Sequence, residues 1–316
     1  MGRYLAVRLY SMVVTLAGLT ILVFLLLHLI PGTVVEQMIG ADAVVSTQMV
    51  EQLKRFFGLD QPWYVQYGRW LAQLLRGDLG LSWRTGKPVW TLIIERLPVT
   101  LELTLLAVAF AFVVGVTAGV VSALRQDRAV DQAARVGMLV GLSLPVFWQG
   151  TMLILFFSLY LRWMPPVVWV DFLADPRRNL TILLLPTICL GTASAATVAR
   201  TTRASMLEVL RSDYVRTALA KGLVGRVVVL KHALKNALIP IVTVAGLQVG
   251  YLLGGSVVVE EVFTLPGVGR LVLWSIYQRD YPVTQSTILF VASAFMAINL
   301  LVDLLYGYLE PRIRYG

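Results

Sequence analysis

The stretch DYVRTALAKGLVGRVVVLKHALKNALIP, residues 213–240, is the most polar part of an otherwise strongly apolar chain. It begins with helix-forming residues that continue the run SMLEVLRS at residues 205–212, and it is broken at Gly222. A second helical run then leads to Pro240. The pattern predicts a long, basic and partly helical connection, residues 200–236, between two apolar segments.

Composition places the flanking segments in a membrane. Apolar residues make up 58% of the 316 residues, charged residues make up 14%, and the mean hydropathy is +0.76. These values exclude an ordinary water-soluble domain. About 20 apolar residues cross a bilayer as a helix, which satisfies its own backbone hydrogen bonds. The fold class is therefore an all-α membrane protein with six transmembrane helices, expected at residues 9–30, 99–124, 136–161, 180–198, 237–259 and 283–309.

Lysine and arginine residues indicate the orientation, because they accumulate in short cytoplasmic loops. The connection 200–236 carries eight basic residues against Glu208 and Asp213, a net charge of +6, whereas the fifth connection, residues 260–282, has a net charge of −1. We expect the connections 200–236 and 125–135 and both termini to be cytoplasmic. The third connection is a weaker indication, because three arginines outnumber two aspartates on the side assigned to the exterior. The overall charge of +9 then reflects orientation and anionic lipid, and no nucleic-acid partner is expected.

The first connection, residues 31–98, is predicted to be an extracytoplasmic subdomain with helices of its own. Apolar residues recur at helical spacing in ADAVVSTQMVEQLKRFFGL, residues 41–59, and Gly58 is expected to end that helix. A second helix is expected in QPWYVQYGRWLAQLLRGDLG, residues 61–80, with aromatic residues along one side. We interpret this stripe as packing and interface anchoring rather than as a ligand cage. The expected domains are residues 1–30, 31–98 and 99–316.

The sequence does not indicate an enzyme. His28 is expected near the outer end of the first span and His232 in a cytoplasmic loop, so the two do not share a catalytic or metal site. The single cysteine, Cys189, excludes an internal disulfide. A phosphate-binding loop is also missing, because the pair Gly86-Lys87 is followed by proline. No residue is therefore assigned to catalysis, a metal or a cofactor, and any ATP used for transport is expected on another chain.

A self-sufficient secondary transporter is the alternative from another class. Such a protein would carry ionisable groups deep in the membrane and broken helices in corresponding positions of two halves. Glu102 and Asp303 are expected near the interfaces instead. Pro145, Pro186 and Pro240 are expected to interrupt helices, but no internal repeat matches them. This alternative stays open as the weaker interpretation.

Two interpretations of the connection 200–236 stay open on its residues alone. Tyr214, Val215, Ala218 and Leu219 form one apolar edge of a short helix, which suits insertion into a groove on a partner protein. A basic helix resting on anionic lipid headgroups fits the same composition.

These residues resemble the EAA-loop signature of binding-protein-dependent ABC importer permeases, in the form found in the dipeptide, oligopeptide, glutathione and nickel branch. The resemblance extends over nearly the whole chain, through RYLAVRLYSMVVTLAGLTILVFLLLHLIPG (residues 3–32), FGLDQPWYVQYGRWL (57–71) and GGSVVVEEVFTLPGVGRLVLWSIYQRDYPV (254–283). Two departures are visible. Thr33-Val34 stands where relatives have Asp-Pro, and Arg216 stands where many relatives carry glutamate.

The resemblance implies a MetI-like type I importer permease with a helical extracytoplasmic insertion after the first helix. It implies that the loop is a coupling helix docked on an ATP-hydrolysing subunit, with the following helix beginning at Pro240. The implied coupling residues are Tyr214, Arg216, Ala218, Ala220, Lys221 and Gly222. Docking of an extracytoplasmic solute-binding protein is expected at Trp63, Tyr67 and Arg69.

The same resemblance implies the assembly and its location. Expected partners are a paralogous permease in a heterodimer, two ATPase subunits or domains that hold ATP and Mg²⁺, the solute-binding protein, and the lipid of a prokaryotic plasma (inner) membrane. The expected function is ATP-driven import of di- or oligopeptides, with glutathione or nickel import as the alternative within the family.

Overall fold

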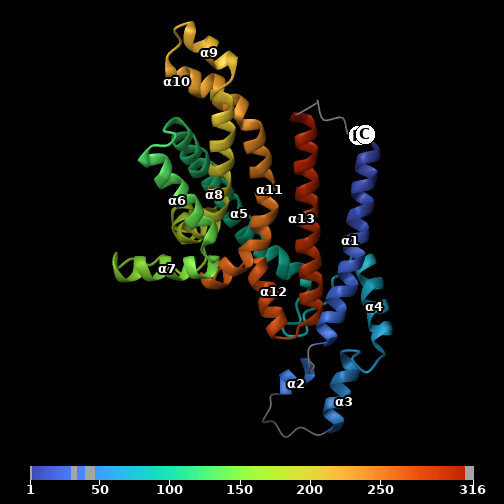
Figure 1. Ribbon diagram of the computed structural model, residues 1–316. Coiled ribbons are helices and arrows are strands. Elements are labelled where there is room, and N and C mark those ends of the chain that lie inside the picture. The colour runs from blue at the N-terminus through green and yellow to red at the C-terminus, as the bar shows by residue number, and fades with distance from the viewer. Residues whose placement is uncertain (1, 30–33, 40–46, 310–316) are drawn as a thin grey trace. The chain divides into compact units, whose positions relative to one another are not determined.

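The computed structural model describes residues 2–29, 34–39 and 47–309, and helices dominate these residues (Figure 1). The chain divides into two compact units. Unit 1 comprises Met1–Pro98 and Gly267–Ala294, and unit 2 comprises Val99–Pro266 and Phe295–Gly316. The domain boundaries expected from the sequence stay a prediction.

The helices are distributed over both units. Unit 1 contains α1 (Gly2–Leu29), α2 (Val34–Ile39), α3 (Thr47–Phe56), α4 (Trp63–Leu75) and α12 (Val268–Tyr277). Unit 2 contains α6 (Ala129–Ser143), α7 (Val146–Leu159), α8 (Pro176–Leu210), α9 (Asp213–Ala220), α10 (Gly225–Val227), the π-helical η1 (Val228–Leu234) and α11 (Lys235–Val262). The helices α5 (Val89–Leu124) and α13 (Tyr281–Leu309) have residues in both units.

Five helices of the described residues are long and apolar enough to cross a membrane: α1, α5, α8, α13 and the continuous helix from Gly225 to Val262. The helices α6 and α7 supply a sixth span only as a pair, because they are bent by 110°. The prediction of six spans is confirmed in this form. The interruption expected at Pro145, within the predicted span 136–161, is confirmed.

Pro145 explains the bend. Proline has no backbone N–H and disfavours the helical conformation in the residue before it. Leu144 is accordingly extended, with ψ of 127°, and Pro145 begins α7 as its N-cap. The interruptions expected at Pro186 and Pro240 are wrong, since both prolines lie inside continuous helices. A membrane helix tolerates a proline when neighbouring groups and local adjustments satisfy the freed carbonyl.

The helix α8 is the centre of unit 2 and packs against α6, α7 and α11. It also lies unusually close to α5. A Cβ atom added to Gly115 of α5 would lie 2.7 Å from the carbonyl oxygen of Ala195, and one added to Gly191 of α8 would lie 3.0 Å from that of Ala107. Small residues allow membrane helices to approach in this way.

Unit 1 contains the helices predicted after the first span. The helix α3 ends at Phe56, and Gly58 follows with φ of +70°, as expected for a helix stop. The loop between α4 and α5 is held by the buried Asp280, whose carboxylate accepts hydrogen bonds from Ser82 Oγ at 2.5 Å and Trp83 N at 3.1 Å. The side of the membrane on which these helices lie stays a prediction.

Candidate functional site

The predicted basic connection forms a helical hairpin at the end of α8. The helix α8 ends at Leu210, and α9 begins directly after the turn at Arg211 and Ser212. The buried side chains of α9, Val215 and Ala218, pack with Val228 of η1. The short helix α9 is therefore fixed by packing to the elements on either side of it.

A hydrogen-bonded cap closes α9 and requires a left-handed residue. Gly222 has φ of +77° and donates its N–H to the carbonyl oxygen of Leu219 at 2.9 Å. The N–H of Leu223 donates to the carbonyl oxygen of Ala218 at 3.4 Å. This pair of bonds is the Schellman cap, for which glycine is preferred because it adopts positive φ without a steric penalty. The break predicted at Gly222 is thus present as a defined turn.

The outward side of the hairpin is apolar. Tyr214 and Leu219, which the sequence placed on one edge with Val215 and Ala218, are exposed rather than buried. Further apolar side chains are exposed after them. We call the six together the hairpin surface: Tyr214, Leu219, Leu223, Val224, Val227 and Leu230. Exposed apolar side chains in this number are typical of a surface that contacts another protein or a membrane.

The other predicted coupling residues lie around this surface. The hydroxyl of Tyr214 accepts a hydrogen bond from Asn236 Nδ2 at 2.8 Å. Arg216 forms an exposed ion pair with Asp213 at 3.5 Å, a type of contact that adds little stability. Ala220 and Lys221 are exposed at the end of α9. Pro240 was expected at the start of the following helix. It lies inside α11 instead, which begins five residues earlier at Lys235 and continues through the proline.

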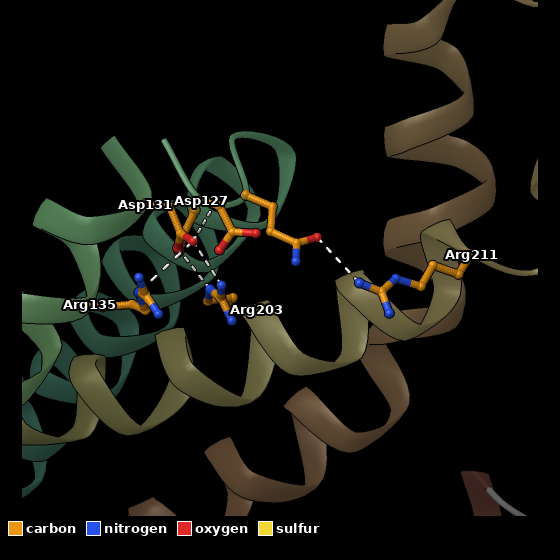
Figure 2. Close-up of polar contacts among 7 residues, drawn as sticks. Asp127, Asp131, Arg135, Arg203 and Arg211 are labelled. Atoms are coloured by element: carbon orange, nitrogen blue, oxygen red, sulfur yellow. Dashed lines mark hydrogen bonds and ion pairs between the residues drawn. The ribbon is translucent and has the colours of Figure 1, made fainter. Parts of the chain in front are cut away.

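A buried ion pair ties α8 to the start of α6 (Figure 2). Asp131 lies in the first turn of α6 and is completely buried. Arg203 of α8 donates from Nε to Oδ1 and from Nη2 to Oδ2 of Asp131, each at 2.8 Å. Ser122 Oγ and the backbone N–H of Asp127 donate to the same carboxylate at 2.5 and 3.0 Å. Such a two-point arginine–carboxylate contact is both strong and geometrically specific.

Arg135 extends this network, and Arg211 makes a separate contact with the α5–α6 connection. Figure 2 shows Arg135 beside Asp131, where Nε lies 3.9 Å from Oδ2. Arg211, at the end of α8, donates to Gln126 Oε1 at 3.5 Å. The hairpin therefore grows from a helix whose last turns are held against the α5–α6 connection.

Sequence reasoning missed Asp131 and Arg203. The two residues are 72 positions apart, and each resembles an ordinary member of a basic cytoplasmic connection. No local signal marks Asp131, because it falls in the connection 125–135 that the sequence assigns to the cytoplasm, where charged residues are ordinary. Only the fold shows that a particular arginine meets it.

Two carboxylates near the ends of the spans also have partners. Glu102 accepts a hydrogen bond from Asn179 Nδ2 at 2.8 Å. Glu260, which the sequence placed in the fifth connection, belongs to α11 and is completely buried. Its Oε1 accepts a hydrogen bond from Thr100 Oγ1 at 2.7 Å. These contacts fix α5 to α8 and to α11.

The residues predicted to dock a binding protein lie on α4. Tyr67 faces α1, because its hydroxyl lies 3.0 Å from Thr20 Oγ1 and its ring packs edge-on against Phe24. Trp63 is exposed, and Arg69 is exposed at a cavity of unit 1. His28 is internally hydrogen-bonded, with Nδ1 2.8 Å from the carbonyl oxygen of Phe24.

Comparisons with known proteins agree over the whole chain. The family described as binding-protein-dependent transport system inner membrane component matches residues 115–315, and the family of its N-terminal part matches residues 1–104. The dipeptide transport system permease protein DppB of Alkalihalophilus pseudofirmus is 45% identical, with 100% of each chain covered. The glutathione transport system permease protein GsiC of Escherichia coli is 43% identical, again with 100% of each chain covered.

A solved structure shows the fold. A chain of the inward-facing MetNI methionine ABC transporter superposes with a TM-score of 0.56 at 18% identity, covering 70% of this chain and 97% of its own length. This similarity confirms the predicted MetI-like permease fold.

Proposed function

This chain belongs to the family of binding-protein-dependent transport system inner membrane components, and we propose that it is the permease subunit of an importer of di- or oligopeptides. The full-length similarity to a dipeptide permease supports this substrate class. The glutathione permease among the relatives favours one second candidate, import of glutathione, which is itself a tripeptide.

Coupling to ATP hydrolysis is assigned to α9. ATP and Mg²⁺ are held by two ATPase subunits or domains on other chains, because this sequence contains no phosphate-binding loop. A conformational change in the ATPase subunits is transmitted to the permease only through a rigid element. Support comes from the packing of Val215 on Val228 and from the cap at Gly222, which together make α9 a firm contact.

The hairpin surface favours a protein partner over lipid headgroups. Figure 1 shows α9 and α10 projecting beyond the end of α8, so their exposed side chains are free to enter a cleft. Val224 at the tip is 69% exposed. An apolar tip flanked by Arg216 and Lys221 fits a groove with an apolar floor and acidic or carbonyl groups at its rim.

The remaining partners follow from the family. A paralogous permease completes the translocation pathway as a heterodimer, and an extracytoplasmic solute-binding protein delivers the substrate. The exposed Trp63 and Arg69 of α4 are assigned to the docking of that protein, whereas Tyr67 supports α4 from within. Both termini and the hairpin lie in the cytoplasm, because basic residues gather there.

Reconstitution tests the proposal. The chain is assembled in vesicles with its paralogous permease and ATPase subunits, and uptake of a labelled dipeptide is measured with and without ATP and the solute-binding protein. We expect uptake only when both are present, with glutathione and Ni²⁺ as parallel substrates. Uptake driven by an ion gradient in vesicles that contain this chain alone would contradict the proposal and favour a secondary transporter.

A further inference from the structure

Unit 1 contains a cavity of about 720 Å³ that the coupling mechanism does not use. It lies among α1, the end of α3, α4, the loop before α5 and the start of α13. Its walls are rich in aromatic side chains: Phe24, Phe57, Trp70, Trp83 and Tyr281. Small-molecule sites in proteins usually measure about 300–1,000 Å³, so the volume suits a ligand of a few hundred daltons.

The walls of the cavity are held in place by their own contacts. Nε2 of His28 lies 3.2 Å from Gln66 Oε1, which ties α1 to α4. Trp83 stacks at a tilt on Tyr281, with ring centroids 5.3 Å apart, and its loop is anchored on the buried Asp280. The cavity is therefore a built feature of unit 1, between elements that are fixed to one another.

Three polar side chains of the walls have no partner among the described residues. The side chain of Gln285 is part of the wall, and the residue is only 4% exposed, yet its amide forms no hydrogen bond within the described part of the chain. Arg55 and Arg69 are exposed at the cavity and form no ion pair with any described residue. The amide of Gln285 is reached from the cavity, so a ligand bound there can hydrogen-bond it in place of solvent.

The combination of these groups specifies the ligand. The guanidinium groups of Arg55 and Arg69, which have no ion pair within the described residues, favour a carboxylate, which arginine binds in a two-point geometry. The aromatic walls favour an apolar body, and the amide of Gln285 can both donate to a carbonyl oxygen and accept from an N–H. A short peptide with a free carboxyl terminus and an apolar side chain offers all three features. A lipid tail offers no partner for the amide.

We propose that this cavity binds a free di- or tripeptide, with its terminal carboxylate on Arg69 and Arg55, its apolar side chain on the aromatic walls and its peptide group on Gln285. The proposal rests on the assignment of this chain to a peptide importer. It adds a site on the permease itself, where peptide is held before translocation, and it gives Arg69 a role besides the docking of the solute-binding protein.

Equilibrium binding to the full-length chain in lipid nanodiscs tests this site. The probe is radiolabelled Ala-Phe, and its competitors are unlabelled Ala-Phe and the amide of Ala-Phe, which lacks the carboxylate. We expect saturable binding that is at least about tenfold weaker for the amide, since a charge-assisted contact is lost. Arg69→Gln should weaken binding of Ala-Phe about tenfold and should abolish the difference between acid and amide.

A matched control separates the cavity from general surface charge. Arg76 follows α4 directly, is exposed and does not line the cavity, so Arg76→Gln should leave binding unchanged. Gln285→Leu should weaken the binding of Ala-Phe and of its amide by the same factor. If the Gln285→Leu chain misfolds because the residue is buried, Arg69→Gln alone is the test. Equal effects of Arg69→Gln and Arg76→Gln would overturn the proposal.

The outcomes also separate this site from the proposed function. If the assembled importer takes up peptide while the nanodiscs show no saturable binding, the cavity proposal fails and the importer assignment stands. If the nanodiscs bind Ala-Phe as expected while the assembled importer transports only Ni²⁺, the assignment as a peptide importer fails instead. If empty solute-binding protein binds in an Arg69-dependent way and Ala-Phe does not, a protein loop occupies the cavity and the proposal is overturned.

Discussion

Asp131→Asn is expected to loosen the contact between α8 and the α5–α6 connection, because it leaves a charged arginine without its partner. Asp131 is 0% exposed, and the side chain of Arg203 is 20% exposed. Removing one member of a buried pair costs about 3–5 kcal/mol. The remaining access of water to Arg203 places this variant at the low end, at about 3 kcal/mol. Arg203→Lys keeps the charge but loses the two-point geometry, so it should cost less.

Coupling is expected to suffer together with stability. Arg203 lies about two turns before the end of α8, which carries α9 directly. A contact weakened by about 3 kcal/mol opens more than a hundredfold more often, since about 1.4 kcal/mol is a factor of ten. The measurement is the number of peptides taken up per ATP hydrolysed, at equal amounts of assembled importer. We expect this ratio to fall for Asp131→Asn while ATP hydrolysis itself continues.

A double-mutant cycle of Asp131→Asn and Arg203→Gln isolates the pair, with thermal unfolding as the second readout. Arg135→Gln is the control, because Arg135 is half exposed and lies 3.9 Å from the carboxylate, so its loss should cost less than about 1 kcal/mol. A coupling energy near zero would refute the reasoning. So would an Asp131→Asn importer with an unchanged ratio of uptake to hydrolysis.

Three more substitutions test other parts of the structure. Gly222→Val should lower peptide uptake per ATP while the complex stays assembled, because a φ of +77° costs a branched residue about 1–2 kcal/mol even though no atom lies within 4 Å of the added Cβ. Gly222→Asn should retain more coupling, because asparagine tolerates positive φ. Normal uptake by the valine variant would count against a rigid α9. Asp280→Asn should make the loop around Ser82 more sensitive to protease, since a charge-assisted hydrogen bond contributes about 1.5–3 kcal/mol. Gly191→Ala should lower the thermal stability by at least about 1 kcal/mol, because its Cβ would lie 2.6 Å from an aromatic carbon of α5, whereas Gly137→Ala, with open space, should be neutral or stabilising.

Local signals in the sequence predicted the elements of this chain well. Apolar length placed the long spans, and glycines marked the stops of α3 at Gly58 and of α9 at Gly222. These features depend on a few neighbouring residues, so a single sequence contains what is needed to find them. The family resemblance, which rested on several motifs in order, is confirmed by the full-length relatives.

The effects of the prolines were not predictable from the sequence alone. Pro145 begins a new helix at a 110° bend, whereas Pro186 and Pro240 lie within continuous helices. Every proline removes the same N–H, and the outcome depends on how the surrounding helices hold the chain. That packing is set by residues far away in the sequence.

The apolar edge of α9 shows the same limit on a smaller scale. Helical spacing correctly grouped apolar residues on a short helix, but it could not say which of them the chain itself would bury. Val215 and Ala218 pack with Val228, and Tyr214 and Leu219 remain outside. The division follows from the hairpin, which returns η1 against one side of α9 only. The docking surface therefore differs from the one that the sequence indicated, because it loses Val215 and Ala218 and gains the exposed residues Leu223, Val224, Val227 and Leu230.

The helix α8 determines what a displacement of α9 does to the rest of unit 2. The two helices are joined by a short turn, and α8 packs on α6, α7 and α11. Arg203 of α8 also forms an ion pair with Asp131 at the start of α6. A force on α9 that moved α8 alone would have to break the ion pair at Asp131 and separate glycine contacts in which no Cβ would fit. Moving α5, α6 and α8 together breaks neither. The cheaper response to a push on the hairpin is therefore a joint movement of these three helices. The helix α11 is expected to move with them, because it continues from the hairpin without a break and is tied to α5 by the hydrogen bond between Thr100 and Glu260.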